Sequence, residues 1–221
     1  MTSKLYLSSD SLSAVTTVLS CTPAEEGQFH LRLAETLFHP QGGGQPSDRG
    51  EIGPARVVGV FLDNEEVVHV TDRPLAVGEW LMAVDEAHRQ LTTRLHSAGH
   101  LIAAVGEARG WTAIKGNHRP GEGRVVFESP VAGHAAPEAD SLRAAVNALV
   151  RQALPRRQDI SGGVRRITWG DLPLYSCGGT HVASTDRVGE VVINSVKFRK
   201  GQLSVSYSLA EQGLLTVEQA S

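Results

Sequence analysis

The chain has 221 residues, and its 21 Lys and Arg against 24 Asp and Glu give a formal net charge of -3. Hydrophobic residues make up 41% and charged residues 20%, which is typical of a globular protein with a substantial core. No apolar run approaches the roughly 18 residues that a membrane-spanning helix needs, so membrane association is not expected. The balanced charge provides no chain-wide basic field of the kind that marks many nucleic-acid binders.

Two groups of cations could still form a local basic patch, although solvated basic faces are an equally ordinary interpretation. The groups are Arg156, Arg157, Arg165 and Arg166, and Lys197, Arg199 and Lys200.

The two cysteines, Cys21 and Cys177, could in principle form one disulfide. The N-terminal segment MTSKLYLSSD lacks the apolar stretch of a secretory signal, so we expect a cytoplasmic protein. In that compartment a lone cysteine near histidines is more typical of a metal or catalytic site than of a disulfide.

Residues 4–85 have the pattern of short β-strands separated by polar turns. A hairpin is predicted around Asp63 and Asn64, between two runs rich in β-branched residues. Such a series favours a small β-barrel, which we assign to a first domain of residues 1–85. The predicted strands are Gln28 to Leu37, Ala55 to Leu62, Glu66 to Val70 and Gly78 to Val84.

Inside this half lies a glycine-rich segment, Phe38 to Gly50, with three consecutive glycines at Gly42 to Gly44. Consecutive glycines disfavour a strand or helix interior but allow positive φ angles and a close approach to a ligand. An ordinary turn explains a bare triplet equally well. The flanking Gln41, Gln45, Ser47 and Asp48 add hydrogen-bonding groups that favour a ligand-binding loop.

A helix is predicted from Glu86 to Arg109, with Asp85 as its N-cap and Gly110 just past its end. His96 and His100 lie four residues apart, so the helix points both imidazoles from one face. The apolar stripe beside them is made of Leu91, Leu95, Ala98, Ile102 and Val105.

The remaining chain alternates between strands and one more helix. We therefore predict a second domain, residues 86–221, of α+β class, with helices on one side of an antiparallel sheet. Its predicted parts are a polar loop at 115–118, a turn and a strand within 121–128, a helix from Pro137 to Leu154, and strands at Val164 to Trp169, Gly189 to Val196 and Leu203 to Leu209.

His96, His100, Cys177 and His181 form a plausible four-ligand zinc set, because zinc favours nitrogen and thiolate donors in a tetrahedron. Gly178 and Gly179 allow the tight turn that brings Cys177 and His181 onto one ion. Four protein ligands are typical of a structural zinc site, whereas a catalytic site keeps one position open. The spacing alone leaves a structural zinc, a catalytic zinc and no metal as alternatives.

A zinc ion here would polarise a carbonyl or lower the pKa of a bound water toward about 7, and either suits ester hydrolysis. The helix motif differs from that of HExxH metalloproteases, because Ser97 and Ala98 stand where those enzymes carry a glutamate base.

Taken in order, these motifs resemble those of the alanyl-tRNA editing proteins of the AlaX type and of the editing domain of alanyl-tRNA synthetase. The wider family is the threonyl- and alanyl-tRNA synthetase additional domain. The matching segments are KLYL (Lys4 to Leu7), LFHPQGGGQPSDRGEI (Leu37 to Ile52), HSAGH (His96 to His100), KGNHRP (Lys115 to Pro120), SCGGTHV (Ser176 to Val182) and VSYSLAE (Val205 to Glu211).

The resemblance implies a trans-editing hydrolase of the medium-length class that removes serine from mischarged tRNA(Ala), with glycine as a second candidate amino acid. It implies zinc at the four ligands, with His96, His100 and Ser97 as catalytic residues, and a barrel joined to an α+β editing domain. It places Gly43, Gly44 and Gln45 near the tRNA acceptor end, with Lys115 and His118 as further substrate contacts. It implies no obligatory protein partner.

The chain departs from the commoner pattern of this family at three positions. Ser97 replaces a threonine, Ile114 stands where a glutamine often precedes the Lys-Gly pair, and Asn117 stands where an aromatic residue is common. Two alternative functions stay open. One is a non-catalytic module that binds the tRNA acceptor arm around a structural zinc, and the other is a hydrolase of a different charged tRNA or of a small ester.

Overall fold

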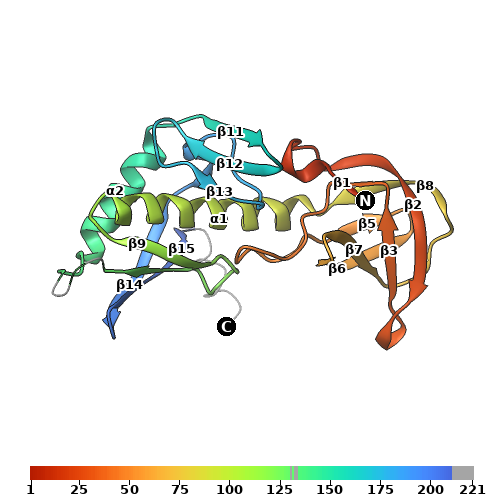
Figure 1. Cartoon of the computed structure of the whole chain (residues 1–221), viewed down its shortest axis with the longest axis horizontal. Helices are drawn as coiled ribbons and strands as arrows, with labels where there is room; N and C mark the ends of the chain where they lie inside the picture. The colour runs from red at the N-terminus through yellow and green to blue at the C-terminus, as the bar shows by residue number, and fades with distance from the viewer. Residues whose placement is uncertain (130, 132–133, 211–221) are drawn as a thin grey trace, which may run out of the picture. The chain divides into compact units, whose positions relative to one another are not determined.

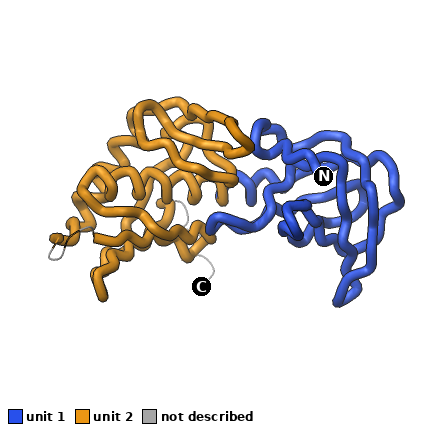
Figure 2. Tube along the Cα trace, in the orientation of Figure 1, with its two compact units in different colours: residues 1–91 blue, residues 92–221 orange. Residues whose placement is uncertain are grey.

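A computed structural model describes residues 1–129, 131 and 134–210 of the chain. The chain divides into two compact units, Met1–Leu91 and Thr92–Ser221, shown in different colours in Figure 2. Helices and mostly antiparallel sheets make the protein α+β, as predicted from the sequence (Figure 1). Glu211, the last residue of the matching C-terminal segment, lies outside the described residues. Within them, no helix combines the length and the apolar character needed to span a membrane.

The first unit is built from strands whose pairings run in the order β2-β3-β7-β6-β5-β8 and return to β2, which closes a barrel. A short parallel pair, β1 with β4, lies outside this ring. The strands are β1 (Ser3–Lys4), β2 (Ser13–Pro23), β3 (Phe29–Leu33), β4 (Glu35–Thr36), β5 (Gly50–Ile52), β6 (Ala55–Asp63), β7 (Glu66–Thr71) and β8 (Gly78–Val84).

The barrel interior is filled by side chains that alternate along the strands, which is the period expected for a sheet with one buried face. In β6 the alternation runs through Ala55 and Val57 and then resumes at Val60, one residue out of phase. A register shift between Val57 and Gly59 explains the change, because a bulge turns the following side chains to the other face. Leu31, Leu33, Ile52 and Met82 complete the centre of this core.

The hairpin between β6 and β7 is confirmed, but its turn lies one residue later than predicted. Asp63 pairs with Glu66, so the two-residue loop is Asn64 and Glu65, both with positive φ. Positive φ at both central residues is the geometry that matches the twist of a tight hairpin.

The glycine-rich segment forms a second tight turn in the first unit. Gly42 and Gln45 exchange backbone hydrogen bonds, and Gly43 and Gly44 between them have φ values of 57° and 80°. The tip is exposed at Gly43, whereas Gln45 is buried. Positive φ is therefore needed at both turn residues, as the glycine triplet suggested.

A buried ion pair fixes this segment to the start of the first helix. The Asp48 carboxylate accepts hydrogen bonds from the guanidinium of Arg89 and, at 2.5 Å, from the backbone N–H of His39. Arg89 also donates to the Leu37 carbonyl at 2.6 Å. Asp48, which the sequence suggested as a ligand group, is thus used inside the protein. The first compact unit ends at Leu91, so the first turn of the helix, with Arg89, belongs to it.

His69 is a fully buried, neutral histidine in the barrel wall. The Leu31 carbonyl can only accept, so the ring proton of His69 is on Nδ1, 3.4 Å from it. Nε2 then accepts a 2.8 Å hydrogen bond from Thr36 Oγ1, which itself accepts the Phe38 N–H at 3.0 Å. Burial lowers the pKa of His69 to about 4 from its usual 6.5. The unfolded chain therefore binds a proton on this residue at a higher pH than the folded chain does.

This arrangement predicts that His69 makes the protein less stable as the pH falls from 6.5 toward 4, with no further loss below 4. Between pH 7.5 and 5, His69 lowers the free energy of unfolding by about 2 kcal/mol. The change is about 1.4 kcal/mol per pH unit over the interval in which this histidine is protonated only in the unfolded state. Urea unfolding of wild type and His69→Gln at both pH values measures it. Equal pH dependence in the two proteins would contradict the buried neutral histidine.

The second unit contains two helices and two sheets among its described residues. The sheet orders are β14-β15-β10-β9 and β11-β12-β13, with every neighbouring pair antiparallel. The elements are α1 (Glu86–Glu107, whose first turns belong to the first unit), β9 (Thr112–Asn117), β10 (Arg124–Glu128), α2 (Ala139–Arg151), β11 (Arg156–Ser161), β12 (Val164–Trp169), β13 (Tyr175–Ser176), β14 (Val191–Arg199) and β15 (Gln202–Leu209).

Helix α1 runs between the two sheets of this unit (Figure 1). Asp85 caps it, accepting the His88 N–H at 3.0 Å, and Gly110 follows its end with φ 84°, as predicted. On one side α1 packs against the four-stranded sheet, because Gly106 leaves room for the Phe127 ring. On the other side Glu107 accepts a 2.5 Å hydrogen bond from Tyr175 of β13. The helix is consequently buried on more than the single predicted stripe.

Several predicted elements differ from the structure. Lys115 and its neighbours were expected in a polar loop, but residues 112–117 form strand β9 by pairing with β10. Strand β11 was not predicted, and with β12 and β13 it makes a second small sheet in place of one continuous sheet. The second helix begins at Ala139 rather than Pro137 and ends at Arg151 rather than Leu154.

Candidate metal centre

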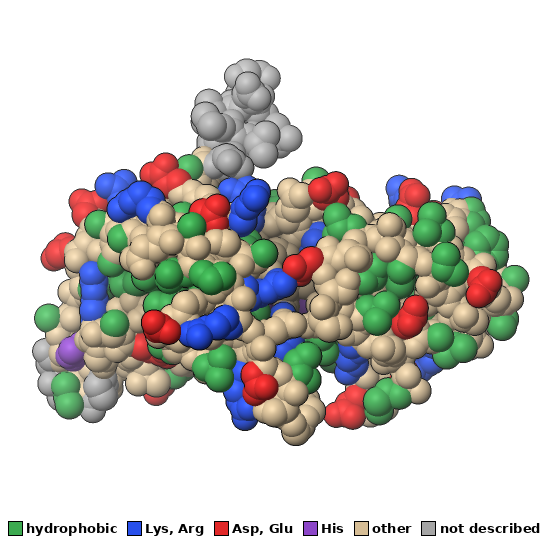
Figure 3. Space-filling view, turned by 90° about the horizontal axis from the view of Figure 1, so that it is seen from above, with side chains coloured by type: hydrophobic (Ala, Val, Ile, Leu, Met, Phe, Trp, Pro, Cys, Tyr) green, Lys and Arg blue, Asp and Glu red, His purple; other side chains and the backbone are tan. Residues whose placement is uncertain are grey.

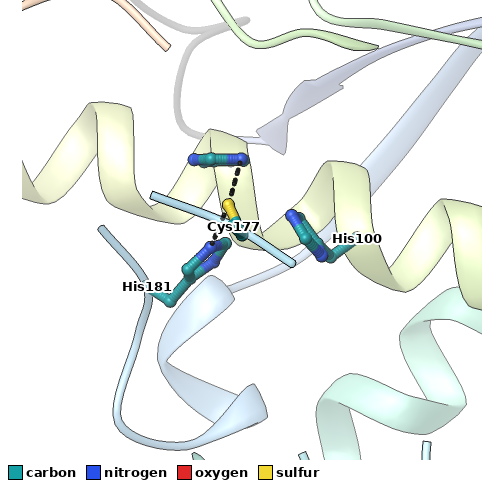
Figure 4. Close-up of side chains that lie close together, drawn as sticks. His100, Cys177 and His181 are labelled. Carbon is teal, nitrogen blue, oxygen red and sulfur yellow. Dashed lines mark hydrogen bonds between the residues drawn. The ribbon is translucent and has the colours of Figure 1, made fainter. Parts of the chain in front are cut away.

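His96, His100, Cys177 and His181 meet in the second unit, and their ligand atoms all lie within 4.8 Å of one another. The two histidines come from successive turns of α1, and the cysteine and third histidine from the turn after β13. Cys177 Sγ lies 3.5 Å from His96 Nε2 and 3.2 Å from His181 Nε2. Figure 4 shows His100, Cys177 and His181 converging from these two segments.

The donor set fits a zinc ion. With Zn–N near 2.1 Å and Zn–S near 2.3 Å, two ligands at a tetrahedral angle lie about 3.6 Å apart, close to the distances between Cys177 and the two histidines. His100 Nδ1 is buried and has no hydrogen-bond partner among the described residues. A buried polar atom without a partner is costly, and a metal ion in the cluster is one way to satisfy this ring.

Hydrogen bonds determine which nitrogen of His181 is available as a ligand. Ser97 Oγ donates to the Thr93 carbonyl at 2.8 Å, so the contact of 3.3 Å to His181 Nδ1 must use a proton on that nitrogen. Nε2 is then left with its lone pair, facing Cys177. Ser97 Oγ also accepts the Val182 N–H at 3.1 Å. The hydroxyl thus orients the His181 ring, as groups behind a metal ligand commonly do.

The electrostatics keep His100 and His181 neutral, which is the form that binds a metal. Burial lowers the pKa of His100 to about 3, and repulsion from His118 and Arg165 adds to the effect. Burial, then repulsion from His100 and Arg165, lowers the pKa of His181 well below 6.5. For Cys177, burial raises the thiol pKa, partly offset by the Gly179 N–H and by Arg165. A bound metal ion would supply the charge needed to deprotonate the thiol.

Two arginines brace the turn that carries Cys177 and His181. Arg165 is 7% exposed and donates to the carbonyls of Cys177 at 3.2 Å and Gly179 at 2.7 Å. Arg156 donates to the His181 carbonyl at 2.5 Å. These members of the first predicted basic group are thus hydrogen-bonded to the turn between Cys177 and His181.

His118, predicted as a substrate contact, lies beside the cluster. Its ring stacks on His96 with centroids 4.5 Å apart, in a space that Gly99 and Gly116 leave open. Tyr207 donates to the Leu95 carbonyl at 2.9 Å, so His118 Nδ1 must donate to the Tyr207 oxygen, 2.6 Å away. His118 Nε2 therefore carries the lone pair, and burial lowers the pKa of the ring to about 4.

The other predicted substrate residues are not part of this cluster. Lys115 is exposed on β9 and its side chain lies on the other face of the sheet from His118, as its pairing with Val126 requires. Gly43, Gly44 and Gln45 belong to the first unit, and their nearness to the acceptor end of a tRNA stays a prediction. Both cysteines are free, as the metal interpretation of Cys177 requires.

Tyr175 and Tyr207 are contacts of the site that sequence reasoning missed, and Arg165, expected only in a basic patch, is a third. Tyr175 rests edge-on against His100 with ring centroids 5.0 Å apart. Tyr175 and Tyr207 lie in or beside the matching segments, so a tyrosine near each motif was the available signal. For Arg165 the sequence offered no signal of a contact with the Cys177 turn, because it is one of two consecutive arginines in β12.

No family model matches the sequence. The chain is 26% identical to the alanyl-tRNA editing protein Aarsd1 of Mus musculus, over 93% of this chain and 58% of that protein. It is 31% identical to the alanine–tRNA ligase of Halorubrum lacusprofundi, over 80% of this chain and 22% of the ligase. It is 28% identical to the alanyl-tRNA editing protein AlaX-M of Pyrococcus horikoshii, over 73% of this chain and 77% of that protein.

The chain thus spans little more than half the length of the mouse editing protein and about a fifth of the ligase. Its similarity to the three proteins confirms the resemblance that the motifs indicated.

Proposed function

Because this chain is similar in sequence to alanyl-tRNA editing proteins of the AlaX type, we propose that it is a deacylase of mischarged tRNA(Ala). The substrate that we assign is Ser-tRNA(Ala), and Gly-tRNA(Ala) is a second candidate. The reaction is hydrolysis of the ester between the amino acid and the 3′-terminal ribose. Water adds to the carbonyl carbon, and the ribose oxygen leaves with a proton, giving free serine and uncharged tRNA.

The observation that carries the proposal is the cluster of His96, His100, Cys177 and His181, two segments that the fold brings within 4.8 Å. In our account these four side chains hold zinc. When bound, zinc supplies a Lewis acid that suits ester hydrolysis, by polarising a carbonyl or lowering the pKa of water. The neutral state of the buried histidines supports this assignment.

The surrounding residues would prepare the site for its substrate. We assign Ser97 to orienting His181, because its hydroxyl is already engaged with Thr93, Val182 and His181. His118 Nε2 is an acceptor next to the cluster, suited to a hydrogen bond from the serine hydroxyl or the amino group. Gly43, Gly44 and Gln45 are assigned to the acceptor end of the tRNA on the resemblance alone.

A deacylase for this task must accept serine and reject alanine, although serine is the larger. Steric exclusion cannot achieve that, but polar groups that need a partner can. When a site is built to bond a hydroxyl, a substrate that lacks it leaves buried polar groups unpaired, and discrimination can reach about 10⁴-fold. An acceptor such as His118 Nε2 is of the required kind.

The alternative that keeps an observation in its favour is a non-catalytic module with a structural zinc. Four protein ligands close the coordination shell in structural sites, whereas catalytic sites usually have three. Such a module would bind the acceptor arm of tRNA and hold zinc but release no amino acid.

The deciding experiment for function measures the release of labelled serine from preformed Ser-tRNA(Ala), with Ala-tRNA(Ala) and Gly-tRNA(Ala) assayed in parallel. We expect serine to be released well above the spontaneous rate and alanine to stay attached. Release of neither by zinc-loaded protein would favour the structural module. Release from a charged tRNA of another identity, with Ser-tRNA(Ala) intact, would assign a different substrate.

A further inference from the structure

The four-stranded sheet of the second unit has two chemically different faces. On β10 and β15, Val125, Phe127, Leu203, Val205 and Tyr207 are buried against the core. The alternate positions of β15, Gln202, Ser204 and Ser206, face the other way, since side chains alternate along a strand. The β15 side chains on this second face are polar, so they can lie in contact with solvent.

Strand register gathers cations on that outward face. Lys197 pairs with Ser204, Ser204 with Val126, and Val126 with Lys115, so one row crosses all four strands with a lysine at each end. In the neighbouring rows Arg199 pairs with Gln202, and Arg124 pairs with Ser206. We call Lys115, Arg124, Lys197 and Arg199 the basic sheet face. The four side chains line one hollow together with Ile114, Val126, Gln202 and Ser204.

These cations have no acidic partners among the described residues. None of the four takes part in an ion pair: Glu128 accepts a hydrogen bond from Gln202 at 3.4 Å, and Glu122 accepts one at 3.1 Å from Asn117, which lies opposite Arg124. Four unneutralised positive charges within one hollow repel one another and therefore favour binding of an anion. In a chain of net charge -3 this concentration is local.

The other basic group of the sequence behaves differently. Arg156 donates to the His181 carbonyl and Arg165 to the Gly179 carbonyl. Arg157 forms an ion pair with Asp171, and Arg166 forms one with Asp159. On the side of the molecule seen in Figure 3, which carries the three-stranded sheet, Lys and Arg side chains lie among Asp and Glu. The two basic groups look alike in sequence but differ in structure. The arginines of the first group have carbonyl or carboxylate partners, whereas Lys197 and Arg199 of the second group form no ion pair among the described residues.

We propose that the basic sheet face binds the sugar-phosphate backbone of the tRNA substrate. This inference rests on the proposed function for the identity of the RNA. Phosphate contacts by lysine and arginine supply most of the sequence-independent affinity for nucleic acid, and serine hydroxyls between them can donate to phosphate oxygens. Strand β9 links the two regions, since Lys115 on this face is three residues from His118, whose ring stacks on His96.

The test is tRNA binding by Lys197→Gln/Arg199→Gln, with Arg143→Gln/Arg151→Gln on α2 as a control that removes equal charge. Fluorescence anisotropy with uncharged tRNA(Ala) over a series of salt concentrations gives the affinity and its salt dependence. We expect the first variant to bind at least about tenfold more weakly and to lose about 2 from the slope of log affinity against log salt, one for each phosphate contact. The control should match wild type, and both variants should keep their zinc.

Each result separates this inference from the proposed function. Wild type that binds tRNA through these cations yet releases no serine leaves the inference standing while the deacylase assignment fails. If Lys197→Gln/Arg199→Gln and wild type reach half of their maximal rate of serine release at the same protein concentration, the inference is overturned and the proposed function stands. Unchanged tRNA affinity in the variant, with loss of binding to vesicles of phosphatidylglycerol and phosphatidylcholine, would assign the face to a lipid surface and also overturn it.

Discussion

Replacing Cys177 with alanine is expected to remove bound zinc and to lower serine release by more than about a hundredfold. Groups that only support a metal ligand change metal affinity or activity by about 10- to 100-fold, and loss of a ligand should exceed that. Thiolate is also the softest donor of the set and the one that discriminates zinc from harder ions. The loss should appear both in metal content, measured by mass spectrometry, and in the rate of deacylation.

Cys21→Ala is the matched control, because Cys21 is the other free cysteine and packs partly against the barrel core. It should keep both zinc and activity. A Cys177→Ala protein with full zinc occupancy and unchanged turnover would refute the assignment of the ligands.

Replacing Arg89 with methionine is expected to destabilise the first unit by about 3–5 kcal/mol, the usual cost of breaking a buried ion pair. The Asp48 side chain is fully buried and Arg89 is 8% exposed, so the change leaves a carboxylate without its charged partner. Urea unfolding of wild type, Arg89→Met and Arg89→Met/Asp48→Asn measures the effect. The double variant should recover part of the loss, because it no longer buries a lone charge.

The exposed pair Arg32–Asp63 is a direct comparison, with the two side chains 38% and 47% exposed. Arg32→Met should cost less than about 1 kcal/mol, because solvent screens such a pair. If Arg89→Met lost no more stability than Arg32→Met, the buried pair would not be what anchors the glycine-rich segment.

The cluster of His96, His100, Cys177 and His181 could be predicted because each half of its signal is local. His96 and His100 are fixed on one face of α1 by helix geometry, and Gly178 and Gly179 supply the turn between Cys177 and His181. The meeting of the two segments is a long-range contact, which spacing suggests but does not determine. The role of Ser97 depends on that contact, since its partners Val182 and His181 come from the distant turn.

Strands with weak sequence patterns were the part of the fold that could not be predicted. β11 has no buried residue, so it lacks the alternation that marks a half-buried strand. β9 leaves Ile114 exposed and has a bulge opposite β10, and its conformation depends on pairing rather than on its own side chains. The basic sheet face was invisible for the same reason, because only strand register shows that Lys115 and Lys197 share one face.

The most direct test of the account is a zinc titration of the deacylase activity. The protein is freed of metal with a chelator, zinc is added in known amounts, and the release of serine from Ser-tRNA(Ala) is followed at each step. We predict no activity without metal, a linear rise, and a plateau at one zinc per chain that Cys177→Ala does not reach. Full activity in the metal-free protein, verified by mass spectrometry, would contradict the proposal that this cluster holds the ion on which hydrolysis depends.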